Sequence, residues 1–365
     1  MITDTFSIKY QLVPHGTEET KIQFYNTIPE IFENLVQNNE QTVICTDSNV
    51  VNIPEVKTFL NKINNANVET VIIPAGEENK TLESVLSIIK AALDKSFTRN
   101  CKFIAIGGGV ISDMTAFASS LYKRGAKLEI VPTTLLSMAD ACIGGKTGCD
   151  FDNYKNMIGT FYPASKLHFC PDFILSLPEN EYLSGLAEVI KTAMLYAPKL
   201  FQILKTEDEK IKSRNKEELY QIIKRCALAK SNIVEKDISE TGLRKQLNLG
   251  HTFGHALESV AGFGKISHGQ AVAWGLGRAI QLSLNLGLCE DDYKDDVFEL
   301  LNIYGYSTEK TPKIIAEQEN VQEKLIKAMK QDKKNDSNGI TFVLQREINS
   351  TLIEIVQEKD ILAVL

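Results

Sequence analysis

The sequence lacks several features that would assign it to a specialised class of protein. None of its seven cysteines belongs to a CxxC pair, so we expect reduced thiols rather than a disulfide framework. No apolar run reaches the roughly 18 residues that a membrane-spanning helix requires. The N-terminal stretch has neither a basic start nor an apolar segment, which predicts no signal peptide and a cytoplasmic protein.

Positive charge is not in excess either. The 40 lysines and arginines are outnumbered by 47 acidic residues, giving a net charge of −7. This balance disfavours broad binding to nucleic acid or to anionic membranes, but it allows a local basic pocket for a small phosphorylated substrate. A chain of 365 residues exceeds what one hydrophobic core usually serves, so two domains are expected.

Histidine is scarce but clustered. The chain has five histidines: His15, His168, His251, His255 and His268. The last three fall within 18 residues, and the first two of these lie four positions apart in "NLGHTFGHALE", on one face of a predicted helix. Glu188, on another predicted helix, would complete a Glu/His/His set with His251 and His268, as in catalytic zinc sites. Glu258, seven residues after His251, is a local alternative to Glu188.

The first half of the chain alternates between strand and helix patterns. Strands are predicted at residues 7–13, 42–47, 68–76, 101–109 and 127–134, and helices at 24–38, 54–66, 81–97 and 110–124. This alternation indicates a Rossmann-like α/β domain with a mostly parallel sheet, over residues 1–174.

The second half, residues 175–365, is predicted to be an all-α domain that binds a metal. Helices are expected at residues 177–195, 201–214, 217–237, 250–262 and 269–287. Residues 339–345 and 351–357 are the exception, since their patterns predict two strands of a small hairpin.

A glycine-rich turn suggests a nucleotide site. In "CKFIAIGGGVISDMTAFASSLY" an apolar strand leads through three glycines into a helix, which lets the backbone approach a diphosphate. Asp47, directly after another strand, is either a partner for a ribose diol or a turn residue. "GGKTG" resembles the end of a P-loop, but residue 140, which should then be glycine, is Asp140. The lysines of these loops suit phosphate groups or are simply solvated.

Several segments together resemble the 3-dehydroquinate synthase family. They include "GGGVISDMTAFASSLYKRG", "PTTLLSMADACIGGKTG", "LPENEYLSGLAEVIKTAML", "RKQLNLGHTFGHALE" and "HGQAVAWG", in order from about residue 42 to about residue 334. The resemblance implies an NAD-binding α/β domain followed by a helical metal domain, and a homodimer.

The resemblance also implies roles for individual residues. It assigns zinc, with cobalt as an alternative, to Glu188, His251 and His268. It assigns NAD contacts to Asp47, Glu77, Lys80, Gly109, Val110, Asp113, Thr133 and Thr134, with Lys146 and Lys155 also near the cofactor. It assigns substrate contacts to Asp140, Lys146, Asn156, Lys191, Lys230, Arg244 and Asn248. His255 would lie against the leaving phosphate, Arg124 would bind phosphate across a dimer interface, and either Lys333 or Lys334 would make a further phosphate contact.

Gln270 departs from the family's usual HGE triplet. A glutamate beside a zinc-bound histidine could orient that histidine by accepting a hydrogen bond. Glutamine still offers an acceptor, but it lacks the negative charge, which puts metal affinity and metal identity in question.

The implied reaction converts 3-deoxy-arabino-heptulosonate 7-phosphate into 3-dehydroquinate and phosphate. It combines transient oxidation by NAD, phosphate elimination, reduction and an intramolecular aldol closure. The alternatives are another sugar phosphate cyclase, a metal- and NAD-dependent polyol dehydrogenase, and a catalytically inactive NAD-binding or scaffold protein. The last would have no use for an intact Glu188/His251/His268 set.

Overall fold

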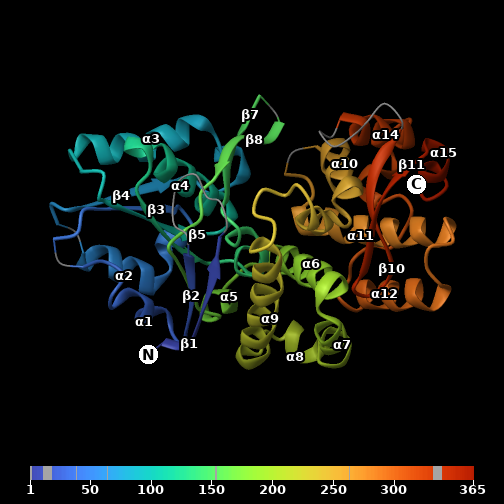
Figure 1. Ribbon diagram of the computed structural model, residues 1–365, viewed down its shortest axis with the longest axis horizontal. Helices are drawn as coiled ribbons and strands as arrows, with labels where there is room; N and C mark the ends of the chain where they lie inside the picture. Colours follow the sequence, from blue (N-terminus) through green and yellow to red (C-terminus); the bar gives the residue numbers. More distant parts are fainter. Residues whose placement is uncertain are drawn as a thin grey trace. The chain divides into compact units, whose positions relative to one another are not determined.

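The computed structural model describes residues 2–10, 19–37, 39–63, 65–152, 154–262, 264–331 and 339–365 (Figure 1). His15 and the pair Lys333 and Lys334 lie outside these residues. The chain divides into two compact units. The first comprises Met1–Leu177 and Lys230–Ser239, and the second comprises Pro178–Ala229 and Glu240–Leu365. The sequence pattern did not indicate that residues 230–239 return to the first unit.

The first unit is built on a sheet whose described strands run in the order β1-β2-β9-β6-β5-β3-β4. The strands are β1 (Ile2–Lys9), β2 (Glu19–Tyr25), β3 (Thr42–Asp47), β4 (Val68–Ile73), β5 (Lys102–Gly107), β6 (Lys127–Pro132) and β9 (Lys166–Phe169). Only the edge pair β1–β2 is antiparallel among these described strands. Every residue of β3 and β5 is buried, as expected where helices cover both faces of a parallel sheet. The predicted Rossmann-like architecture is confirmed.

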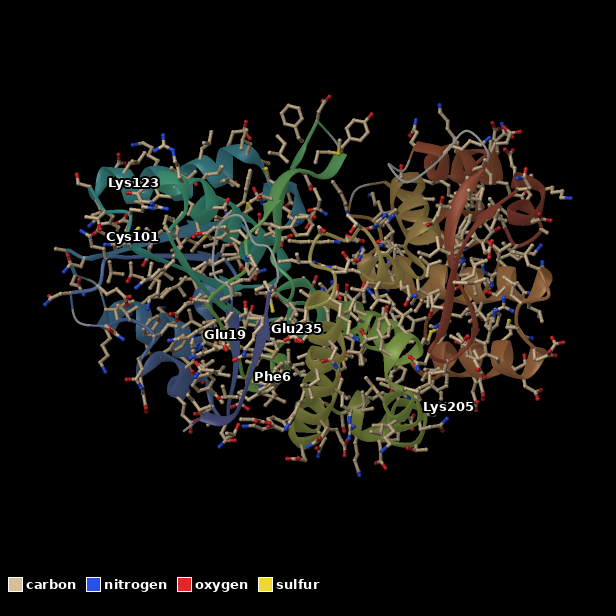
Figure 2. All side chains as sticks on the ribbon, viewed as in Figure 1. Phe6, Glu19, Cys101, Lys123, Lys205 and Glu235 are labelled. Carbon is tan, nitrogen blue, oxygen red and sulfur yellow. The ribbon has the colours of Figure 1, made fainter. Side chains whose placement is uncertain are left out.

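Helices and a ribbon complete this unit. The helices are α1 (Ile28–Phe32), α2 (Pro54–Lys62), α3 (Leu82–Asp94), α4 (Gly109–Leu121) and α5 (Asp172–Leu175). Strands β7 (Lys146–Phe151) and β8 (Tyr154–Phe161) pair with each other as an antiparallel ribbon outside the main sheet (Figure 1). The segment Lys230–Ser239 also belongs to this unit. The Lys9 N–H donates to the carboxylate of Glu235 at 3.0 Å. Glu235 is labelled in Figure 2.

The strand order creates a topological switch point between β3 and β5. From β3 the chain moves outward to β4, and it then returns to add β5 on the other side of β3. In open α/β sheets, ligands bind beyond the carboxyl ends of the strands at such a point. Asp47 ends β3 and Gly107 ends β5, so these two residues flank the expected crevice.

The helix and the strand predicted near the N-terminus differ in their bounds from the structure. The helix predicted at residues 24–38 is much shorter, because Tyr25 still belongs to β2 and α1 begins only at Ile28, with Pro29 in its first turn. The strand predicted at residues 7–13 is present as β1, which runs from Ile2 to Lys9, and residues 11–13 lie outside the described residues. Pairing of β2 with β1 and β9 decides both boundaries, and such tertiary pairing is not visible in local periodicity.

The second unit is mostly helical. Its helices are α6 (Glu179–Tyr196), α7 (Pro198–Thr206), α8 (Asp208–Lys212), α9 (Lys216–Val234), α10 (His251–Ala261), α11 (His268–Asn285), α12 (Asp291–Ile303), α13 (Lys313–Ala316), α14 (Val321–Gln331) and α15 (Glu358–Leu362). The last residues of α9 belong to the first unit. The helix predicted at 201–214 is two helices, separated at Glu207, where φ is −113°. Among the described residues, no helix is long and apolar enough to span a bilayer.

The predicted hairpin is confirmed, so the second unit is not purely helical. Strands β10 (Ile340–Glu347) and β11 (Ser350–Val356) pair antiparallel, and β10 is buried for most of its length. Helices α6 and α11 carry buried residues on every side, which makes them the centre of this unit.

Candidate metal and nucleotide sites

The candidate metal ligands come from three helices of the second unit. Glu188 lies in the buried middle of α6 and is 1% exposed. His251 and His268 are the first residues of α10 and α11. The start of α11 can approach α6 closely because Gly269 has no side chain. A Cβ there would lie 2.0 Å from the Ser184 carbonyl oxygen, and the Gly269 N–H donates to Ser184 Oγ at 3.0 Å.

The three donor groups converge with a spacing that suits a divalent metal. Glu188 Oε1 lies 3.4 Å from His268 Nε2 and 3.8 Å from His251 Nε2. Zinc bonds of about 2.0–2.1 Å in a tetrahedral arrangement would place two donor atoms about 3.3 Å apart. One carboxylate and two imidazoles are also a chemically appropriate zinc set. The residues therefore fit the metal that the sequence predicts.

The environment keeps His251 ready to act as a ligand. Burial, together with the nearby Lys191 ammonium, holds the pKa of His251 well below its ordinary value. Its Nδ1 lies 3.2 Å from the Leu249 carbonyl oxygen, a contact that orients the ring and leaves Nε2 facing Glu188. No sequence signal could reveal this backbone partner. Lys191 forms an ion pair with Glu188, and both side chains are 1% exposed.

A second three-residue group shares one histidine with the first. His255, Glu258 and His268 also bring donor atoms within 4.8 Å of one another. Here His268 uses its other nitrogen, because Nδ1 lies 3.4 Å from Glu258 Oε2. Burial lowers the pKa of His268, but the hydrogen bonds with Glu188 and Glu258 outweigh it and raise this pKa to about 10.

The Gln270 side chain does not have the role that the sequence suggested. Its side-chain oxygen accepts from the Ser267 N–H at 3.3 Å and lies 3.1 Å from the Ser267 hydroxyl. Ser267 in turn accepts from the Gln270 N–H, which completes a capping box at the start of α11. The hypothesis that residue 270 orients His268 is therefore corrected. Glu258 contacts His268 instead, and the sequence suggested it only as a rival ligand.

The other predicted site residues of the second unit lie on α10 or directly before it. The His255 ring lies 5.3 Å from that of His251, and the residue is exposed. Asn248 and Arg244 belong to η5 (Leu243–Asn248), which directly precedes α10. Asn248 Nδ2 donates to Glu240 Oε1 at 2.6 Å, and Arg244 is 1% exposed.

In the first unit, the turn from β5 into α4 is suited to a diphosphate. Gly108 caps α4 without a side chain, so the first N–H groups of a 13-residue helix, at Gly109 and Val110, face outward from the strand end. A Cβ at Gly108 would lie 3.0 Å from Thr134 Cγ2, which shows how closely the neighbouring loop approaches.

The polar groups beside this turn differ in whether they already have a hydrogen-bond partner. One Asp47 oxygen accepts from the N–H groups of Asn49 and Val50 at 2.8 and 2.9 Å, so the turn role considered from the sequence is realised. The Thr133 hydroxyl is buried and has no hydrogen-bond partner among the described residues. The Thr133 N–H donates to the Gly107 carbonyl at 3.0 Å, which places this hydroxyl at the carboxyl edge of the sheet. A buried hydroxyl left without a partner here fits a polar cofactor group.

The Lys80 ammonium contacts three other predicted residues. It donates to Asp113 of α4 at 2.7 Å and to Asn156 of β8 at 2.7 Å, and it lies 4.0 Å from Glu77 of η2 (Glu77–Asn79). Burial opposes its charge, but the Asp113 and Glu77 carboxylates raise the pKa of Lys80, which stays protonated at neutral pH.

A second lysine of the first unit, Lys230, also contacts another predicted site residue. Lys230 donates to the Asp140 carbonyl at 2.6 Å and lies 2.9 Å from the Asp140 carboxylate. Arg124, Lys146 and Lys155 are exposed residues on η3 (Tyr122–Arg124), β7 and β8, and their ligand roles stay predictions.

Comparison with known proteins decides the family. Residues 70–184 match the model of the 3-dehydroquinate synthase N-terminal domain, and residues 185–335 match that of its C-terminal domain. A 3-dehydroquinate synthase of Dictyoglomus turgidum is 38% identical over 296 residues, which are 81% of each chain. The chain belongs to the 3-dehydroquinate synthase family. The resemblance inferred from the sequence motifs is thus confirmed.

Solved structures similar to this family member share its fold across both units. A 2-epi-5-epi-valiolone synthase from Streptomyces hygroscopicus, with NAD⁺ and Zn²⁺ bound, has a TM-score of 0.84 at 22% identity and covers 97% of this chain and 98% of its own. A 2-deoxy-scyllo-inosose synthase complexed with carbaglucose-6-phosphate, NAD⁺ and Co²⁺ also has a TM-score of 0.84 at 22% identity, covering 99% of each chain. At this identity the similarity establishes the fold.

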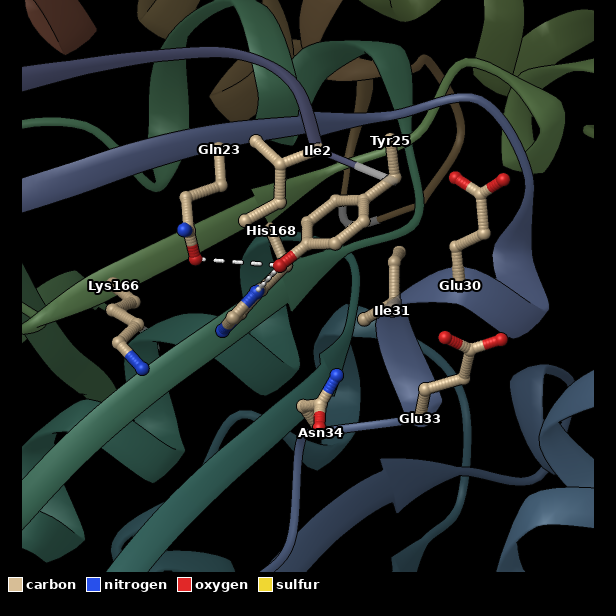
Figure 3. Close-up of a pocket in the computed structure, with 9 residues that line it drawn as sticks. All are labelled: Ile2, Gln23, Tyr25, Glu30, Ile31, Glu33, Asn34, Lys166 and His168. Atoms are coloured by element: carbon tan, nitrogen blue, oxygen red, sulfur yellow. Dashed lines mark hydrogen bonds between the residues drawn. The ribbon is translucent and has the colours of Figure 1, made fainter.

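The first unit also contains a cavity that is separate from the residues assigned by the family. It has a volume of about 190 Å³ and lies among β1, β2, β9 and α1 (Figure 3). On its wall, Tyr25 Oη lies 3.0 Å from His168 Nδ1, and His168 Nε2 lies 3.0 Å from Glu129 Oε2. None of the predicted site residues lines this cavity, so we interpret the network as structural.

Proposed function

We propose that this protein is a 3-dehydroquinate synthase, which converts 3-deoxy-arabino-heptulosonate 7-phosphate into 3-dehydroquinate and inorganic phosphate. The observation that carries the proposal is the convergence of Glu188, His251 and His268 in a chain whose family similarity extends over both units. A scaffold protein would have no need to bring two histidines to a buried carboxylate in a metal-binding arrangement.

Each unit contributes a different part of the chemistry. When bound, NAD⁺ supplies the transient oxidation and later re-reduction of a substrate hydroxyl, and the divalent metal polarises the oxygen of that group. The diphosphate of the cofactor would lie at the start of α4, against Gly109 and Val110. The metal would be held by Glu188, His251 and His268.

The charged side chains are assigned to the substrate. Lys146, Lys191 and Arg244 would bind its carboxylate and phosphate, because ammonium and guanidinium groups make charge-assisted hydrogen bonds to such anions. Asp140 already orients the Lys230 ammonium at 2.9 Å. Asn248 and the exposed His255 ring would position the leaving phosphate and keep it oriented for departure.

Supply of both cofactors and the substrate tests this function directly. Stripped enzyme is incubated with NAD⁺, zinc and 3-deoxy-arabino-heptulosonate 7-phosphate, and the product is identified by mass and NMR. We expect 3-dehydroquinate, one phosphate released per substrate lost, and no change in absorbance at 340 nm. Because the hydride is returned, NAD⁺ should be required but not consumed.

Other outcomes of the same assay identify the alternatives. Accumulation of NADH in proportion to substrate lost would establish a dehydrogenase. Phosphate release without NAD⁺ would indicate a metal-dependent phosphatase. A different cyclic product from another sugar phosphate, with none from this substrate, would indicate another sugar phosphate cyclase.

A further inference from the structure

His268 is held between two carboxylates, one at each ring nitrogen. Its Nε2 lies 3.4 Å from Glu188 Oε1, on the side where the metal ligands converge. Its Nδ1 lies 3.4 Å from Glu258 Oε2, on α10. A histidine that binds a metal through Nε2 must carry its proton on Nδ1, and a fixed acceptor for that proton sets both the tautomer and the ring orientation.

The two histidine ligands differ in the kind of acceptor that they meet. His251 Nδ1 faces a neutral backbone carbonyl, that of Leu249, at 3.2 Å. His268 Nδ1 faces a carboxylate whose side chain is 11% exposed, so water screens its charge only weakly. A carboxylate acceptor makes an imidazole a stronger donor to a metal than a carbonyl does. The residue at position 270 cannot share this task, because its amide oxygen is engaged with Ser267.

We propose that Glu258 is a positioning residue, which accepts the Nδ1–H of His268 and so holds Nε2 toward Glu188 and the metal. Glu258 also adds negative charge beside the metal ligands. This charge matters because the ion pair with Lys191 offsets the charge of Glu188. The proposal rests on the metal-dependent function only in requiring that Glu188, His251 and His268 bind the metal. Its test therefore measures metal binding and not turnover.

The test compares two substitutions of Glu258 in the full chain. Glu258→Ala removes the acceptor, and Glu258→Gln keeps an acceptor oxygen but removes the charge. Zinc affinity is measured by competition with a chelator, and the ligand field by the visible absorption of the Co²⁺-substituted protein. We expect Glu258→Ala to weaken zinc binding about 10- to 100-fold and to shift the Co²⁺ spectrum, with one metal per chain still bound at saturation. Glu258→Gln should fall between Glu258→Ala and the original protein.

Two control variants make these results specific. Glu323→Gln removes an exposed carboxylate of α14 in the same unit and should leave zinc affinity unchanged. His255→Ala removes a member of the second three-residue group and should also leave the stoichiometry of one metal per chain. Circular dichroism establishes that each variant is folded. If Glu258→Ala does not fold, the near-isosteric Glu258→Gln carries the test alone.

Two results would overturn the proposal. One is a folded Glu258 variant with unchanged zinc affinity and an unchanged Co²⁺ spectrum. The other is loss of the metal in both Glu258→Ala and His255→Ala with retention in His251→Ala, which would make Glu258 a ligand of the alternative site. If the original protein binds zinc tightly but does not form 3-dehydroquinate, the proposed function fails while the role of Glu258 can still be measured.

Discussion

At the scale of the residue, protonation and pairing decide what the candidate sites can do. His251 is neutral because it is buried next to Lys191, so it can bind a metal without first losing a proton. Lys80 remains charged because carboxylates surround it in spite of burial. These two groups lead to separate predictions for the second and first units.

Removal of the His251 side chain should remove the metal. We expect His251→Ala to bind less than a tenth of the metal bound by the original protein, measured by atomic emission after gel filtration, because two remaining ligands hold zinc poorly. The control is His255→Ala, which should still bind one metal per chain. His255 is exposed, whereas His168 is buried and its removal would disturb the core. Stoichiometric metal in His251→Ala would refute the ligand assignment.

Replacement of Lys80 should weaken both NAD⁺ binding and stability. Lys80→Met leaves the Asp113 carboxylate without the ammonium that lies 2.7 Å away, which should cost about 1.5–3 kcal/mol in the free energy of unfolding. Urea unfolding measures the stability, and calorimetry measures NAD⁺ affinity. The double variant Lys80→Met/Asp113→Asn should recover part of the stability, because the buried Asp113 charge is then removed together with its partner. Equal stability of the single and double variants would argue against a coupled pair.

At the scale of the element, the distance between α6 and α11 determines whether the ligands can meet. The two helices approach closely at Gly269, beside His268, where a Cβ would overlap the Ser184 carbonyl oxygen. The contact is backbone against backbone, so no side-chain rearrangement can relieve an added methyl group. The geometry of the candidate metal site thus depends on a residue that is not itself a candidate ligand.

Gly269→Ala should separate the two helices and disturb the metal site. We expect a loss of about 1–3 kcal/mol in the free energy of unfolding and weaker zinc binding. Gly277→Ala, in the same helix, is the matched control, because its Cβ would lie 3.5 Å from Leu301 in ordinary contact. That variant should be as stable as the original or gain up to about 1 kcal/mol from helix propensity. Similar losses in both variants would show that the effect is not specific to the approach of α6.

At the scale of the whole molecule, stability depends on the buried polar network of the first unit as well as on its apolar core. His168 is 3% exposed and lies between Tyr25 and Glu129. Burial lowers the pKa of His168 and raises that of Tyr25 to about 12. Both shifts favour the uncharged forms in the folded state.

These shifts predict loss of stability at both ends of the pH range. Below the ordinary histidine pKa of about 6.5, the unfolded chain binds a proton that folded His168 resists, so the free energy of unfolding should fall with decreasing pH. Above about pH 10, ionisation of Tyr25 in the unfolded chain has the same effect. Urea unfolding at pH 7.5 and 5.5 should show a smaller difference for His168→Gln than for the original protein. An unchanged difference would exclude His168 as a source of the acid sensitivity.

The α/β unit and the helical unit were both predictable from local sequence patterns, and the candidate site residues were proposed from the sequence as well. The apolar strands at Thr42–Asp47 and Lys102–Gly107 and the glycine turn after the latter are local patterns, because burial on both faces selects apolar residues. Helical periodicity likewise placed His251 on a face with Glu258, since residues seven apart lie two turns apart.

Which groups these residues contact depends on packing between segments that are distant in the sequence. Pairing with β9 extends the strand Glu19–Tyr25 through Phe24, although the local pattern predicted a helix from residue 24. Contact between helices distant in sequence brought Glu188 to the histidines and gave Glu258 the Nδ1 side of His268, while Gln270 became a helix cap. Spacing along one helix fixes which residues share a face, but the group that a face meets depends on the packing of another segment.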